Sequence, residues 1–149
     1  MYSDDRAVSV TVGYVLNFAM AALLISGVLV AGGGLIESQT KQVTTNELTV
    51  VGQQVADELS SADRLVRAGD VSALSIRSDL PRRTAAGAYT INITVDGNDG
   101  AIVLETSSPE VSVTVPFRIQ SDLQADRVQG GPIRIEYDAA NDRLRVVSA

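Results

Sequence analysis

The fold is decided by an uncharged stretch near the N-terminus, residues 7–36, which reads AVSVTVGYVLNFAMAALLISGVLVAGGGLI. No charged residue lies between Arg6 and Glu37, and the apolar residues of the stretch leave no polar stripe on a helix. A helix that crosses the hydrocarbon core of a bilayer needs about 20 apolar residues, and a helix of about thirty residues extends about 45 Å. The stretch therefore predicts a transmembrane helix over residues 8–36.

A cleaved secretory signal peptide is the alternative interpretation of this stretch. The apolar run is about twice as long as the core of a signal peptide, and no small-x-small cleavage site follows it. The lead-in, residues 1–6, carries one basic residue. We therefore expect the helix to remain in the mature protein.

Two features interrupt the apolar character of this helix. Its polar residues Thr11, Asn17 and Ser26 are expected to form hydrogen bonds within the helix or to neighbouring helices. Three consecutive glycines, Gly32–Gly34, each cost about 1 kcal/mol of helix propensity relative to alanine. At this point the chain either forms an open turn or continues as helix.

Beyond Glu37 the sequence keeps a helical period, but one face becomes polar. Apolar residues recur at steps of three and four, at Leu48, Val51, Val55, Leu59, Ala62 and Val66. This spacing places them along one side of a helix. Gly69 favours a helix C-terminus. The pattern predicts an amphipathic helix over residues 37–69, which continues the first helix directly or after a kink.

The C-terminal part, residues 70–149, alternates apolar and polar residues with a period of two, which is typical of strands. Six short strands are expected, around residues 74–77, 89–95, 102–104, 111–117, 133–137 and 144–146. Residues 120–131 are expected to form a connection. The predicted fold class is α+β, with a small antiparallel sheet or sandwich as the head. The amphipathic helix is the nearest element that can cover its apolar face.

Composition excludes several classes of function. The chain has no histidine and no cysteine, which removes the usual general base, the thiolate nucleophile and most zinc ligands. A net charge of −6 disfavours a nucleic-acid partner. We therefore expect a protein that is not an enzyme and has no cofactor or bound metal. Lys41 is the one lysine against eleven arginines, and twelve of the eighteen acidic residues are aspartate, which points to a halophilic source.

Four short motifs could carry chemistry. Residues 96–100, DGNDG, resemble a calcium loop but lack its ligand spacing, so a tight hairpin turn is expected. Asp57, Glu58 and Asp63 are expected on a solvated helix face, paired with nearby arginines. Arg82 and Arg83 follow a proline and could bind an anion or a neighbouring subunit, although an exposed turn is the simpler interpretation. Asn92, in the sequence Asn-Ile-Thr, is a candidate N-glycosylation site on the polar face of its strand.

The start of the helix resembles the N-terminus of haloarchaeal type IV pilin-like proteins. Residues 4–10 read DDRAVSV and pass at once into the apolar run. In that family a membrane aspartyl peptidase, the prepilin-type peptidase, removes a short charged leader by cutting after a basic and a small residue. The resemblance places the cut after Arg6 and Ala7, so that residues 1–7 are the leader and Val8 becomes the new N-terminus.

The resemblance extends to the whole architecture. Such proteins have a long N-terminal helix, whose first half lies in the membrane or in a filament core, and an external β-rich head. The resemblance is closest to a group of haloarchaeal pilin-like envelope proteins. Val10 stands where many haloarchaeal pilins have proline, and Val12 where bacterial pilins have glutamate. The first difference leaves room for a minor subunit, and the second is expected of an archaeal protein.

The resemblance implies a structural, possibly minor, subunit of an archaeal type IV pilus-like surface filament. Its partners would be other subunits, the membrane and the prepilin-type peptidase. It would lie in the cell membrane before assembly and in an extracellular filament afterwards, with the head outside. Helix packing independently favours assembly at Leu24 and at small residues that allow close approach. These are Ala19, Ala22, Ser26 and Gly27. The alternative is a monomeric, membrane-anchored envelope protein whose head binds a partner.

Overall fold

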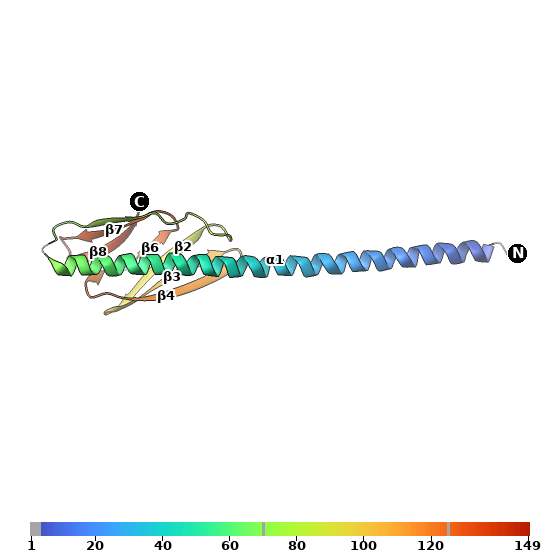
Figure 1. The fold of residues 1–149 in the computed structure, drawn as a ribbon, viewed down its shortest axis with the longest axis horizontal. Helices are drawn as coiled ribbons and strands as arrows, with labels where there is room; N and C mark the ends of the chain where they lie inside the picture. The colour runs from blue at the N-terminus through green and yellow to red at the C-terminus, as the bar shows by residue number, and fades with distance from the viewer. Residues whose placement is uncertain (1–3, 70, 125) are drawn as a thin grey trace. The chain divides into compact units, whose positions relative to one another are not determined.

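The computed structural model describes residues 4–69, 71–124 and 126–149, without the side chains of residues 4–9. The described residues form one helix followed by eight strands (Figure 1). The helix α1 spans Asp4–Ala68. The strands are β1 Ser75–Ser78, β2 Tyr89–Asp96, β3 Asp99–Ser107, β4 Glu110–Arg118, β5 Asp122–Leu123, β6 Asp126–Gln129, β7 Ile133–Asp138 and β8 Arg143–Ser148. The predicted α+β class is confirmed.

The chain divides into two compact units within α1, the first reaching Gln39 and the second running from Thr40 to Ala149. We call the strands and loops of the second unit, which follow α1, the head. The backbone stays helical through Gly32–Gly34, so the glycines do not open a turn. The helix begins at Asp4, before the predicted start at residue 8.

The strands form two four-stranded sheets, with the orders β1-β7-β8-β5 and β4-β3-β2-β6. The described strand pairs are antiparallel except β5 with β8, and β6 lies near β8, where the two sheets approach each other. The prediction of an uninterrupted connection over residues 120–131 is wrong, because β5 and β6 lie within it. Each is short, and β6 has the single apolar residue Val128, so neither shows the alternation of a longer strand.

The second half of α1 covers the head, as predicted. Its seam residues Leu48, Val55 and Leu59 are fully buried and belong to one hydrophobic core with residues of both sheets. Gly52 lies where the helix packs closely on the second sheet. A Cβ atom there would lie 2.6 Å from Val115 Cγ2 and 2.9 Å from Leu104 Cδ1. The absence of a side chain at this position therefore permits the close packing of helix and sheet.

Carboxylates on α1 also bind the head through hydrogen bonds. The Ala85 N–H donates to Glu47 Oε2 at 2.7 Å, and the Ser78 hydroxyl donates to Glu58 Oε1 at 2.7 Å. Gln54 Nε2 adds weaker contacts with the same serine and the same glutamate, each at 3.2 Å. Apolar burial and these polar contacts together fix the second half of α1 on its own head.

Candidate functional site

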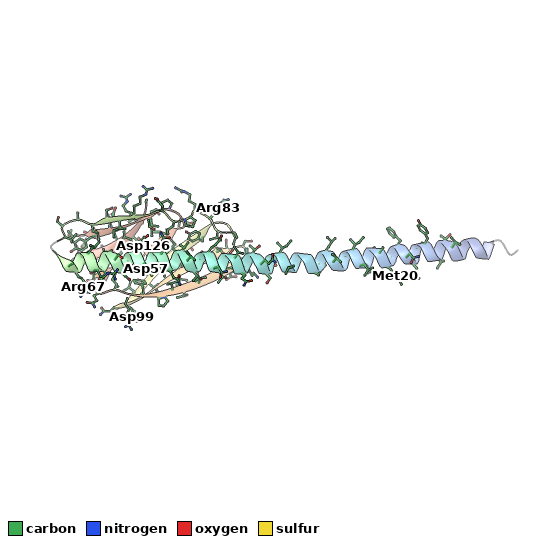
Figure 2. All side chains as sticks on the ribbon, viewed as in Figure 1. Met20, Asp57, Arg67, Arg83, Asp99 and Asp126 are labelled. Carbon is green, nitrogen blue, oxygen red and sulfur yellow. The ribbon has the colours of Figure 1, made fainter. Side chains whose placement is uncertain are left out.

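The candidate site is the apolar surface of α1 between Val10 and Ile36. Every large apolar side chain in this segment is exposed, with 55–80% of its surface accessible. These residues are Val10, Val12, Tyr14, Val15, Leu16, Phe18, Met20, Leu23, Leu24, Ile25, Val28, Leu29, Val30, Leu35 and Ile36. Figure 2 shows side chains projecting from the helix on both sides of the segment that carries Met20. No part of the described chain buries this surface.

The predicted assembly residues all lie on this segment but on more than one face. At about 100° per residue, Ala19, Ala22 and Ser26 share one side of the helix, whereas Leu24 and Gly27 lie on another. The Ser26 hydroxyl donates to the Ala22 carbonyl at 2.8 Å, so this polar group is satisfied within the helix as expected. Gly27 has no atom near the position of a Cβ. The helix therefore offers contact surface in several directions.

The chemistry of this surface is that of a membrane helix. Burial of one large aliphatic or aromatic side chain is worth about 1.5–3 kcal/mol, and the segment exposes fifteen large apolar side chains. The helix is long and apolar enough to cross a membrane. It lies near the N-terminus of the chain, as the sequence predicts. These properties indicate membrane association.

The predicted leader site falls at the edge of what the structure describes. Arg6, Ala7 and Val8 have helical backbone as part of α1, but their side chains lie outside the described part of the chain. Residues 1–3 of the leader are not described. Cleavage between Ala7 and Val8 therefore stays a prediction from the sequence.

The sequon lies on the outer face of the second sheet, as predicted. Asn92 is half-buried on β2, between its cross-strand partners Val103 on β3 and Arg127 on β6. Thr94, two residues further along the strand, is exposed on the same face. Its hydroxyl donates to the Ala101 carbonyl at 3.3 Å. Modification of Asn92 by a glycan stays a prediction.

The acidic motif at residues 96–100 is a hairpin turn, as predicted. Asp96 and Asp99 are paired across the turn between β2 and β3, and Gly97 has a φ of 60°. A positive φ at this position favours glycine. The Asp99 carboxylate is paired with Arg118 Nε at 2.8 Å. The aspartates of this motif thus close a hairpin.

The prediction that the helix carboxylates form a solvated face is wrong for Asp63. It is buried, and its Oδ1 accepts the N–H groups of Gln120 and Ser121 at 3.1 and 2.8 Å. Burial raises the pKa of Asp63, but hydrogen bonds from Ser121 and Gln120 and the charge of Arg67 outweigh it. The pKa therefore lies below the ordinary value of 3.8. The predicted pairing with an arginine is present, since Arg67 Nη1 lies 3.8 Å from Asp63 Oδ2.

The sequence pattern also missed two residues of the buried helix face. Thr44 is fully buried and Gly52 is buried, although neither is a large apolar residue. Both continue the steps of three and four that define the seam, since Thr44 stands four residues before Leu48. Their spacing from the apolar residues could have predicted their burial. A threonine and a glycine do not count as large apolar residues, so the pattern did not include them.

Comparison with known proteins gives a family for the chain. No curated protein and no solved structure matches it. The family model described as a family of unknown function, DUF7266, matches residues 3–148. This match covers both the apolar helix and the head, and the chain therefore belongs to the DUF7266 family.

Proposed function

We propose that this protein is a structural subunit of an archaeal type IV pilus-like surface filament. It is held in the cell membrane by the first half of α1 before assembly. The same helix surface then joins neighbouring subunits in the filament core. The role is structural rather than catalytic, and the partners are further subunits, the membrane and a prepilin-type peptidase.

One observation carries this proposal: fifteen large apolar side chains are exposed around a single helix. Such a helix leaves lipid only if other apolar surfaces replace the lipid. A bundle of like helices provides those surfaces, and small residues allow their backbones to approach closely. Ala19, Ala22 and Ser26 supply one small face, and Gly27 extends close approach to another side.

The charged start of the helix supports processing before assembly. Asp4, Asp5 and Arg6 precede the apolar run directly, as in the haloarchaeal pilin-like proteins that the sequence resembles. Under this proposal the peptidase cuts between Ala7 and Val8 and leaves a mature chain that starts with the apolar helix. The arginine-rich and aspartate-rich composition fits a halophilic archaeal surface, on which the head faces outward.

The proposal is tested by the substitution Leu24→Arg. An arginine near the centre of a membrane helix costs about 2.5–3.5 kcal/mol on insertion scales, and burial between helices without a partner adds to this cost. We expect far fewer filaments, counted by electron microscopy at matched expression. The control is Thr94→Ala, which removes the sequon from the head and should leave filament numbers unchanged.

Normal assembly of a membrane-inserted Leu24→Arg chain would contradict the role of the helix in the filament core. A chain that stays in the membrane as a monomer, with or without this substitution, would instead favour an anchored envelope protein whose head binds a partner.

A further inference from the structure

Five arginines of this acidic protein lie on the first sheet of the head or in the loop after its strand β1. We call this group the arginine patch: Arg77, Arg82, Arg83, Arg134 and Arg145. Two carboxylates lie among them, Asp79 and Glu136. The patch therefore has three excess positive charges on a chain whose net charge is −6.

Three arginines of the patch, on β1, β7 and β8, lie on neighbouring strands of the first sheet. Arg77 and Arg134 are direct cross-strand partners in the pairing of β1 with β7. Like charges at such positions destabilise a sheet. Arg134 and Arg145 share a single carboxylate, Glu136, at 3.2 and 2.7 Å. Asp79 and Glu136 offset this repulsion, because they are paired with these strand arginines.

Arg82 and Arg83 are the part of the patch that is free to bind. Both are exposed, and neither is paired with a carboxylate anywhere in the described chain. Their loop is held in place, because Leu80 is buried and the Tyr89 hydroxyl donates to the Pro81 carbonyl at 2.7 Å. A loop that is already ordered loses little entropy when it binds.

A groove suited to an arginine side chain lies where α1 packs on the head. The groove has a volume of about 420 Å³ and lies between α1 and β1. Val50 and Ile76 give it an apolar lining for the stem of an arginine, and Asp57 and Glu58 supply carboxylates. We call it the acidic groove, lined by Val50, Gln53, Gln54, Asp57, Glu58, Ser61 and Ile76.

The carboxylates of the acidic groove have no ion-pair partner among the described residues. Asp57 is exposed, and the Glu58 carboxylate accepts only neutral donors, Ser78 and Gln54. Glu105, on the outer face of the second sheet, is instead paired with Arg127 at 3.1 Å. The groove therefore offers the arginines carboxylates that no described cation neutralises.

We infer that Arg82 and Arg83 of one copy dock in the acidic groove of a second copy of this chain. In Figure 2, Arg83 lies at the periphery of the head and Asp57 on α1, on separate parts of the surface. A contact between two different surfaces of identical subunits is heterologous, and it generates an open helical array when the rotation between subunits does not close a ring. The inference rests on the proposed filament, to which it adds a contact between heads.

Cross-linking tests this contact directly, because the natural chain contains no cysteine. Full-length chains carrying Arg83→Cys and Asp57→Cys are given different tags and expressed together. Sheared filaments are then treated with a short bis-maleimide. The expected product is a dimer that carries both tags. Each variant expressed alone should give no dimer, and neither should a pair in which Thr94→Cys replaces Arg83→Cys.

A charge exchange separates a docking contact from accidental proximity. Adding Arg82→Glu to the Arg83→Cys chain should abolish the mixed dimer. Adding Gln53→Arg to the Asp57→Cys chain should restore it, because the new arginine lies in the groove and faces the new glutamate. Failure of this restoration would contradict the assigned contact.

The outcomes also distinguish this contact from the proposed function. Filaments without mixed dimers would overturn the contact and leave the filament role intact. Mixed dimers in membranes without filaments would support the contact and reject the filament. If neither filaments nor mixed dimers form, both ideas fail.

Discussion

The two halves of α1 are built from similar apolar residues but differ completely in burial. Leu24 in the first half is 72% exposed, whereas Leu59 in the second half is fully buried. The difference follows from pattern, because large apolar residues surround the helix in the first half, whereas most of those in the second half lie along one buried seam. A seam can be covered by the chain's own head. A surface that is apolar on all sides has to be covered by lipid or by other helices.

The largest expected effect comes from removing the second half of α1 from the head. A fragment of residues 70–149 loses the five buried apolar residues of the helix seam, Leu48, Val51, Val55, Leu59 and Ala62. Each large aliphatic residue contributes about 1.5–3 kcal/mol, against about 5–15 kcal/mol for a whole domain. We expect this fragment to be unfolded by circular dichroism and residues 40–149 to be folded and soluble. Equal melting temperatures for the two fragments would contradict the packing described here.

A single substitution in each half makes the same comparison on a smaller scale. Leu59→Ala leaves a cavity in the core and should destabilise the head by about 2–5 kcal/mol. Leu24→Ala removes a side chain that the head does not contact, so the unfolding of the head should not change. Both are measured by thermal unfolding of the full chain in detergent. A comparable loss from Leu24→Ala would show that the head depends on the first half.

The glycines provide a matched pair in which the predicted signs are opposite. Gly52→Ala places a methyl group against Val115 and Leu104. Overpacking of this kind costs about 1–3 kcal/mol. Gly33→Ala meets no neighbouring atom and should stabilise the helix by up to about 1 kcal/mol. Denaturant unfolding measures the first, and helix content in micelles measures the second. A stabilised head in Gly52→Ala would show that helix and sheet can move apart.

The last effect concerns pH and is confined to the head. The pKa of Asp63 is lowered below 3.8 in the folded state, so its contribution to stability is present above that value. The contribution is lost as the pH falls through the folded pKa. Asp63→Asn should cost about 1–2 kcal/mol near neutral pH, since the N–H groups of Gln120 and Ser121 would then donate to an uncharged acceptor. The variant should also lose less stability than the parent below about pH 4. If the stabilities of the two proteins changed in parallel with pH, the role assigned to Asp63 would be contradicted.

Regular patterns made much of this fold predictable. The seam of α1 and the alternation in β2, β3, β4, β7 and β8 repeat over several residues, so each element is specified several times in the sequence. β5 and β6 were not predictable, because strands of two and four residues are too short to show an alternation of apolar and polar residues. Their pairing depends on neighbours that lie far away in the sequence.

The residues of the sites show the same limit. The exposed apolar helix was predictable because its chemistry is continuous over residues 7–36. The burial of Asp63 was not, because it depends on backbone N–H groups of Gln120 and Ser121, more than fifty residues away. The like-charge pairing of Arg77 with Arg134 depends on strand register and is visible only in the folded sheet.

The most direct test of the central claim is the N-terminus of the protein in the cell. Surface filaments are sheared from cells, purified, and mapped by mass spectrometry. The filament model predicts that this chain is present and begins at Val8, and that Arg6→Glu leaves it uncut in the membrane. A chain that keeps residues 1–7 and is found only in membranes would contradict the model.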